Sequence, residues 1–201
     1  MRSKLAGICM GLGAVLVLGA LALFLWNQKE AWQAEKYSGN VFSRMLACIE
    51  SEGVDTGRDG KSNRVEGNAF KMDDMEIDGY GYIGYLMIPS LGLELPVMSE
   101  WDYERLGMAP CRYSGTILSG DLVIAAHNYP QHFGTISKLS EGAQVLFVDV
   151  HGIEFSYNVI AVEVLDSDDV EGMTAGAYAL TLFTCDYGGQ NRVTVRCERE
   201  Q

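Results

Sequence analysis

The sequence has few basic residues, and this shortage argues against one large class of function. Lys and Arg together number 15 against 27 Asp and Glu, which gives a formal net charge of −12 and a pI near 4.6. Proteins that bind nucleic acid neutralise phosphates with clustered Lys and Arg, and the chain has no basic stripe. We therefore expect no nucleic acid partner and attribute the acidity to solubility.

Paired metal-binding motifs are also missing. The chain has five scattered cysteines and three histidines, with no C-x-x-C pair and no zinc-like spacing. A structural zinc site is therefore not expected. The odd cysteine count predicts at least one free thiol, while a Cys111–Cys197 disulfide stays open.

Charge is absent from Leu5 to Trp26, a run of 22 residues. A helix of this length spans about 33 Å, enough to cross the hydrocarbon core of a bilayer. Arg2 and Lys4 precede the run, so the positive-inside rule places residues 1–4 in the cytoplasm and the bulk of the chain outside. The alternative is a cleaved signal peptide, but the run is longer than a typical h-region and no clear A-x-A site follows it. We expect an uncleaved, single-pass anchor over residues 5–26.

Residues 27–78 are expected to form a juxtamembrane helix and a linker. The sequence favours a helix over residues 27–49, broken near Gly39. From residue 50 to about residue 78 the chain is rich in Gly, Ser, Asp and Asn, which is typical of linkers.

Residues 79–201 show the pattern of a β domain. Short apolar segments separated by turn residues predict strands at 85–88, 94–98, 122–126, 145–150, 153–165, 180–185 and 192–197. Short helices are expected at 101–106 and 134–139, and a loop at 166–179. This spacing predicts a mainly β barrel or sandwich with minor helix.

Three polar residues near strand ends are candidates for catalysis. Alternation along residues 180–185 places Cys185 at the end of a strand, just before a Gly-containing loop. If the next strand pairs with it as an antiparallel hairpin, Arg192 lies near Cys185, whereas Arg196 lies about 13 Å further along the strand. His127 ends an apolar strand, where a polar side chain falls naturally at a rim.

These residue types suit nucleophilic catalysis. A thiolate is the nucleophile, a nearby His can exchange its proton, and an Arg presents fixed donors to a developing oxyanion. Taken singly, each is more often structural: a Cys fills a core and an Arg at a strand start is solvated. The residues alone therefore give only a candidate triad of Cys185, His127 and Arg192.

The string TLFTC at residues 181–185 resembles the TLxTC signature of the sortase family. In that family the motif ends the seventh strand of an eight-stranded β-barrel, the catalytic Arg opens the eighth strand, and the catalytic His follows the fourth. Arg192 matches the Arg position, and His127, 58 residues before Cys185, matches the His position. The resemblance implies an eight-stranded sortase-type β-barrel with short helices over residues 79–201, preceded by an N-terminal transmembrane helix.

The resemblance also implies an activity. Sortases cleave an LPxTG-like sorting signal near the C-terminus of a secreted protein, form a thioester, and transfer the protein to an amine of the cell wall or of a pilin. Cys185 would be the nucleophile, His127 the general acid and base, and Arg192 the binder of the substrate carbonyl and oxyanion. Thr184, Asn128 and Tyr187 would border the substrate groove. The implied location is the outer face of a Gram-positive-type membrane, with secreted proteins and a peptidoglycan precursor or pilin amine as partners.

The sortase class stays open, and no cofactor is expected. Pilus-building sortases often carry an N-terminal lid with an Asp-Pro-aromatic motif, and this sequence has no Asp-Pro dipeptide. Class B enzymes usually have a long helix between strands six and seven, and residues 166–179 are too few for it. The sequence thus fits neither pattern cleanly, and the resemblance is only class B- or D-like, with the class left open. Some sortases are tuned by calcium, but a solvated loop is the simpler interpretation of the acidic candidates Asp166, Asp168, Asp169 and Glu171.

Two other functions compete with a transpeptidase. A cell-wall cysteine hydrolase or L,D-transpeptidase typically places its Cys before its His, whereas here His127 precedes Cys185. A membrane-tethered, non-enzymatic β-domain would leave the three candidate residues independently replaceable. Alkylation of the thiol separates this binding module from both enzymes, because only the module should tolerate it.

Overall fold

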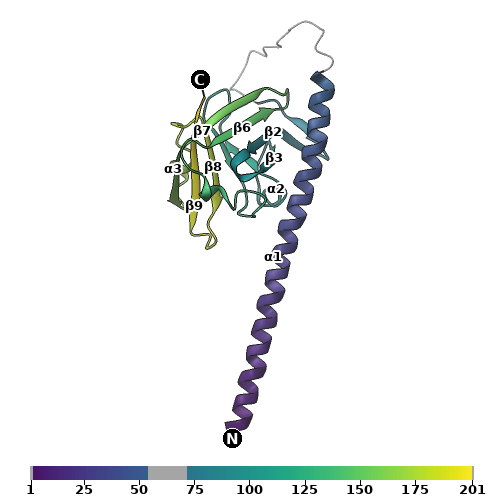
Figure 1. The fold of residues 1–201 in the computed structure, drawn as a ribbon, viewed down its shortest axis with the longest axis vertical. Coiled ribbons are helices and arrows are strands. Elements are labelled where there is room, and N and C mark those ends of the chain that lie inside the picture. Colours follow the sequence, from purple (N-terminus) through teal and green to yellow (C-terminus); the bar gives the residue numbers. More distant parts are fainter. Residues whose placement is uncertain (1, 54–71, 201) are drawn as a thin grey trace.

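The chain consists of one long helix followed by a closed β-barrel (Figure 1). A computed structural model describes residues 2–53 and 72–200, with helix side chains described from residue 10 to residue 51. Its helices are α1 (Arg2–Gly53), α2 (Tyr103–Leu106) and α3 (Val170–Met173), with 3₁₀ turns at Pro89–Leu91 and Ile136–Lys138. Its strands are β1 (Met75–Ile77), β2 (Tyr80–Ile88), β3 (Leu93–Met98), β4 (Cys111–Ser114), β5 (Leu122–Ala125), β6 (Gln144–Asp149), β7 (Glu154–Asp166), β8 (Leu180–Cys185) and β9 (Asn191–Arg199).

Eight strands close the barrel in the order β2–β3–β4–β5–β8–β9–β7–β6, and β6 pairs back to β2. The β3–β4 and β5–β8 pairs are parallel, and the other neighbours are antiparallel. The predicted eight-stranded barrel with short helices is confirmed. Because β5 and β8 are parallel, their C-terminal ends lie at the same rim.

The two faces of β8 pack into different clusters. Leu180 and Leu182 are fully buried in the barrel core. Phe183 points the other way and packs with Met173 of α3. Since successive side chains of a strand alternate between faces, Cys185 lies on the outer face together with Phe183.

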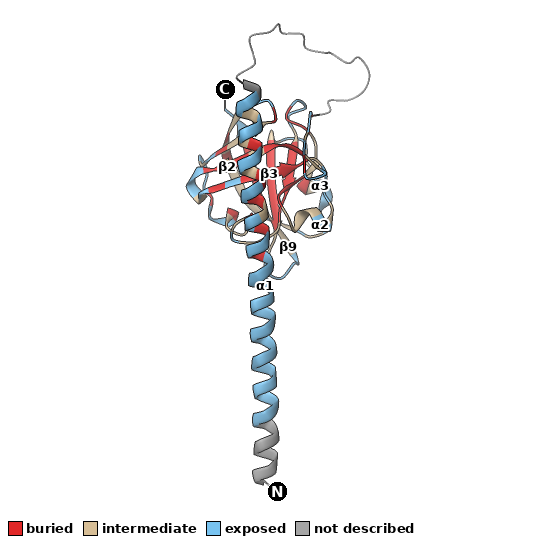
Figure 2. Ribbon diagram, turned by 90° about the vertical axis from the view of Figure 1, so that its right-hand side faces the viewer, coloured by how far each residue is buried: buried red, intermediate tan, exposed pale blue. Residues whose placement is uncertain are grey.

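The C-terminal half of α1 packs one face against the barrel (Figure 2). Its buried positions recur every three or four residues, as one face of a helix requires, at Ala31, Ala34, Ser38, Val41 and Met45. The predicted break near Gly39 is wrong, because the helix runs through this residue without interruption. A helical Gly costs only about 1 kcal/mol relative to Ala, which the packing on either side offsets.

The N-terminal half of α1 extends away from the barrel and is exposed from residue 10 to residue 30 (Figures 1 and 2). Within the described residues, α1 is the one helix long and apolar enough to cross a membrane, with a mean hydropathy of 2.0 over its most apolar stretch. This finding is compatible with a membrane anchor. The boundaries of the span at residues 5–26 stay a prediction.

The stretch interpreted as a linker contains ordered structure at both ends. α1 continues to Gly53, and β1 pairs with the start of β2; residues 54–71 lie outside the described part. The β1–β2 turn consists of Asp78 and Gly79, with φ of 55° and 82°. Positive φ at both positions is typical of a two-residue hairpin turn with Asp-Gly. The sequence therefore held a hairpin signal at the edge of the expected linker.

Candidate active site

The β8–β9 hairpin brings Cys185 and Arg192 together. The predicted antiparallel pairing is confirmed, with Cys185 directly opposite Arg192 and Thr181 opposite Arg196. Opposed residues in such a pair have Cβ atoms about 4.5–5.5 Å apart. Arg192 is therefore the neighbour of the thiol, and Arg196 lies at the far end of the hairpin.

Hydrogen bonds fix the turn that joins these strands. The carboxylate of Asp186 accepts bonds from the Gln190 backbone N–H at 3.0 Å and from the Asn191 side-chain amide at 2.7 Å. The Asn191 bond is the largest cause of the lowered pKa of Asp186. The Arg192 guanidinium donates to the carbonyl oxygens of Gly189 and Asn191 at 3.2 and 3.1 Å. These bonds hold the guanidinium beside the rim where β8 ends.

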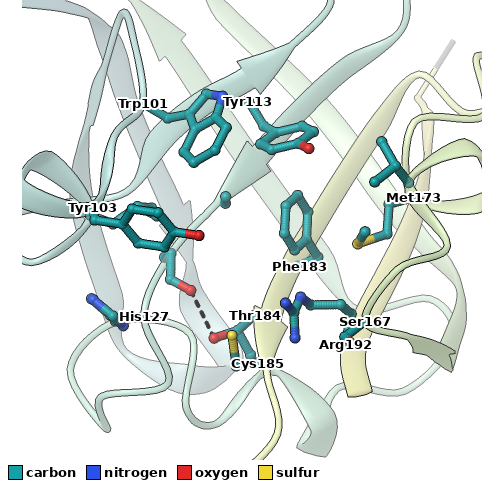
Figure 3. Close-up of a pocket in the computed structure, with 14 residues that line it drawn as sticks. Trp101, Tyr103, Tyr113, His127, Ser167, Met173, Phe183, Thr184, Cys185 and Arg192 are labelled. Carbon is teal, nitrogen blue, oxygen red and sulfur yellow. Dashed lines mark hydrogen bonds between the residues drawn. The ribbon is translucent and has the colours of Figure 1, made fainter. Parts of the chain in front are cut away.

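His127 reaches the same rim from β5. The Thr184 hydroxyl donates to the carbonyl oxygen of Ala126 at 2.8 Å, which ties the end of β5 to the end of β8. His127 follows directly, and its ring lines the cavity that Cys185 and Arg192 also line. Figure 3 shows Cys185 between His127 and Arg192. The structure therefore brings the three candidate catalytic residues together.

Burial controls the protonation of His127. Loss of hydration lowers the pKa of its ring, and the Glu30 carboxylate on α1 opposes this effect in part. Tyr129 stacks on the ring, with centroids 4.9 Å apart and planes at 29°. The lowered pKa favours a neutral imidazole at neutral pH, which can accept a proton from a thiol.

The remaining described thiols have other environments. Cys111 and Cys197 are free and fully buried, and burial raises the pKa of each to about 12. The disulfide left open by the sequence is therefore not formed in this structure. Cys48 is exposed on α1. Cys185, half-buried at the barrel rim, lies opposite Arg192 and lines one cavity with His127.

An apolar cavity of about 250 Å³ lies against the thiol (Figure 3). Its wall includes four aromatic side chains, Trp101, Tyr103, Tyr113 and Phe183. The Tyr113 ring lies 5.0 Å from Trp101 and meets Phe183 edge-on at 5.2 Å, measured between centroids. We did not predict this wall from the sequence. The Trp-Asp-Tyr string at residues 101–103 is its one local signal, because the other rings come from distant strands.

The three predicted substrate-groove residues differ in what surrounds them. Thr184 is 3% exposed, and its hydroxyl is bonded to backbone. The Asn128 side chain donates to the Asp186 carbonyl at 3.3 Å and so connects the loop after β5 with the β8–β9 turn. Tyr187 is 93% exposed in that turn. Their contacts with substrate stay predictions.

The acidic stretch 166–171 contributes a helix cap. The Asp169 carboxylate accepts the backbone N–H of Gly172 at 2.8 Å and caps α3. No group of three or more His, Cys, Asp or Glu side chains suited to a metal ion occurs among the residues that the structure describes.

A closed eight-stranded barrel with Cys, His and Arg at one rim is the arrangement that the TLFTC resemblance implies. The family model described as "Sortase domain" matches residues 86–200, more than half of the sequence. The chain therefore belongs to the sortase family.

Individual relatives support the same placement. The chain is 28% identical over 142 residues to sortase A of Bacillus anthracis, covering 68% of this chain and 65% of that protein. Sortase C-3 of Streptococcus pneumoniae has 24% identity and a TM-score of 0.56, with 86% of this chain and 84% of that chain covered. Clostridium perfringens sortase C, solved with the C-terminal cell wall sorting motif, has 22% identity and a TM-score of 0.53, with 81% and 90% covered. At these identities the two structures show the shared fold.

Proposed function

We propose that the protein is a cysteine transpeptidase that cleaves an LPxTG-like sorting signal and joins the released acyl group to a primary amine. The observation that supports this most strongly is the register of Cys185 with Arg192, at the rim where His127 follows β5. A thiol nucleophile needs a proton acceptor, and its acyl intermediate needs a partner for negative charge. The two neighbours supply these functions.

In the first half-reaction, the Cys185 sulfur attacks the carbonyl carbon of the signal's threonine. His127 accepts the thiol proton and then donates it to the departing amine, as the C–N bond breaks and the thioester remains. Arg192 donates hydrogen bonds to the carbonyl oxygen as it becomes negative. Its planar fork suits this role because the donors are fixed before the charge develops.

In the second half-reaction, a primary amine attacks the thioester carbonyl. A C–N bond forms, the C–S bond breaks, and the thiolate leaves. His127 accepts a proton from the amine nitrogen and returns it to the sulfur. Attack by water in place of the amine would release the free acid, which is hydrolysis.

The aromatic cavity beside Cys185 fits an apolar side chain of the sorting signal. Burying one side chain of the size of Leu stabilises a complex by about 1.5–3 kcal/mol. Trp101, Tyr113 and Phe183 supply an apolar surface for it. An apolar residue ahead of the scissile threonine, as in LPxTG, would then hold the carbonyl over the thiol.

The proposed location is the outer face of the cytoplasmic membrane, with α1 as the anchor. The β8–β9 turn points along α1 toward its exposed N-terminal half (Figure 1). Secreted proteins that carry a C-terminal sorting signal, and amines of a peptidoglycan precursor or a pilin, are the proposed partners.

The test uses the full chain in detergent micelles, a panel of LPxTG-like peptides, and a glycine- or lysine-type amine, with products followed by mass spectrometry. We expect a peptide–amine conjugate from the wild type and from Cys48→Ala, whose thiol is remote, but none from Cys185→Ala. Cleavage without transfer would support the cysteine hydrolase. No turnover and no acyl-enzyme across a broad panel would support the non-enzymatic domain.

A further inference from the structure

A second hollow lies between α1 and the loop that carries His127. Its volume is about 480 Å³. It is formed by α1, at the end of the apolar run and in the turn that follows it, and by two loops of the barrel rim. The residues that matter for its chemistry are Asn27, Glu30, His127, Asn128, Tyr129 and Tyr187.

This hollow adjoins the thiol along two sides. His127 lines both the hollow and the catalytic cavity. Asn128 and Tyr187 also line a smaller cavity that Cys185 borders. A molecule in the hollow is therefore separated from a thioester on Cys185 only by the catalytic histidine and its neighbours.

Glu30 gives the hollow a negative charge. Glu30 lies one helical turn after Trp26 on α1. One oxygen of its carboxylate accepts a hydrogen bond from the Trp26 indole N–H at 2.6 Å, and this bond orients the carboxylate. Within the described part of the chain, none of the ion pairs includes Glu30. Its charge reaches His127, whose pKa it raises against the larger effect of burial. The hollow thus presents an oriented carboxylate without a cationic partner, close to the catalytic histidine.

We propose that this hollow receives the acceptor amine, with Glu30 as the counter-charge of its ammonium form. The inference rests on the proposed transpeptidase function and adds the binding site of the second substrate. The bound ammonium loses one proton to solvent, and the neutral nitrogen then attacks the thioester. His127 accepts the second proton as the C–N bond forms and returns it to the departing Cys185 sulfur.

The direction of proton transfer supports binding of the acceptor amine on the side of His127 that faces the hollow. His127 protonates the departing amine in the first half-reaction, so the amine leaves from the side of that ring. The acceptor amine enters the same reaction in reverse, and therefore occupies the same position. The aromatic cavity on the other side of His127 is meanwhile filled by the acyl part of the substrate.

The test compares two nucleophiles on the full chain in detergent micelles. A glycyl peptide carries an ammonium group at neutral pH, whereas hydroxylamine is uncharged. We expect Glu30→Gln to raise the KM for the glycyl peptide about two- to fivefold, because loss of one exposed ion pair has a small effect. The KM for hydroxylamine should stay unchanged. Glu35→Gln is the matched control, because Glu35 is exposed on the same helix but lies outside the hollow.

Several results would overturn the inference. Equal changes for both nucleophiles in Glu30→Gln would show an indirect effect through His127, and an unchanged KM for the glycyl peptide would show that Glu30 does not bind it. An equal rise of the KM for the glycyl peptide in Glu35→Gln would show that the effect comes from the overall surface charge and not from a site at Glu30. Failure of the wild type to form any acyl-enzyme would contradict the proposed function itself, and the inference with it.

Discussion

Residues with the same functional group behave differently in this molecule because of where the strands place them. Cys185 and Cys197 lie on adjacent strands, yet Cys197 faces the core and Cys185 ends its strand on the outer face. The sequence predicted Cys185 at the end of its strand, before a Gly-containing loop, as the structure has it. His127 was preferred among the three histidines because it ends an apolar segment, but its catalytic role depended on the family resemblance, because a histidine at a strand end is not by itself a catalytic signal.

Replacing Arg192 by lysine tests the role of its guanidinium. Lysine keeps the charge but loses the fixed fork, so we expect kcat/KM for the sorting peptide to fall about 100-fold. Arg199→Lys, on the exposed end of the same strand, is the control. Steady-state kinetics measures both, and an Arg192→Lys variant with more than half of the wild-type value would contradict the assignment.

His132 makes the stability of the barrel depend on pH. The residue is fully buried, and burial lowers its pKa to about 4. The unfolded chain binds a proton below about pH 6.5 that the folded chain excludes, so stability is complete above this pH and is lost as the pH falls. We expect a loss of about 2 kcal/mol in the free energy of unfolding between pH 6.5 and pH 5.

Chemical denaturation of the full chain at pH 7 and pH 5 measures this effect. The burial-lowered pKa of His127 contributes with the same sign. His132→Phe removes the larger contribution, so this variant should lose clearly less stability at pH 5. An identical pH dependence of the variant and the wild type would contradict the assignment to His132.

Among the elements, the loop between β7 and β8 depends on β9 for its position. Arg196, only 2% exposed, donates to the carbonyl oxygens of Gly172 and Met173 at 2.7 and 3.2 Å. It also pairs with Glu163 on β7 at 2.7 Å. Met173 lines the catalytic cavity. Arg196 thus connects the barrel wall with the loop that forms one side of the proposed substrate site.

Substitution of Arg196 should therefore affect substrate binding from a distance. We expect Arg196→Met to raise the KM for the sorting peptide severalfold and to lower stability by about 1–3 kcal/mol, because the loop carbonyls lose their donor. Glu163→Gln keeps those two bonds and should have a milder effect. Peptide kinetics and denaturation measure both variants. An unchanged KM in Arg196→Met would show that the loop between β7 and β8 does not contribute to peptide binding.

Elements differ in how far the sequence predicts them. β8 was predicted with its observed bounds, since a short apolar run ends at a Gly-containing turn. β4 was missed because its four residues carry two polar side chains and form a strand through pairing with β3 and β5. α3 was missed for a similar reason: its four residues are held by the Asp169 cap and by Arg196, which lies 23 residues beyond Met173.

For the molecule as a whole, closure of the barrel could not be predicted from local sequence patterns. The ring closes where β2 pairs with β6, and Gly84 lies opposite Asp149. Only the family resemblance predicted a barrel in preference to a sandwich. Docking of α1 was also not predicted, because its buried positions 31–45 include small and polar residues that make a weak apolar stripe.

The proposed membrane orientation can be tested by labelling a cysteine that the chain already contains. Cys48 is exposed on α1 and lies 22 residues beyond Trp26, on the side of the barrel. In a Cys185→Ala background, we expect a membrane-impermeant maleimide to label Cys48 in intact cells, because the buried Cys111 and Cys197 are protected. Cys48→Ser should abolish the labelling. Labelling that requires lysis of the cells would reverse the orientation.

The central claim is that Cys185 forms a thioester with a sorting signal, and the most direct test is the intact mass of the full chain. The protein is mixed with an LPxTG-like peptide without added amine, quenched in acid, and digested to locate the modification. We expect an added mass equal to the peptide acid that ends at its threonine, less one water, carried on Cys185 and removed by hydroxylamine. Peptide cleavage without this adduct, or an adduct that persists in Cys185→Ala, would contradict the account.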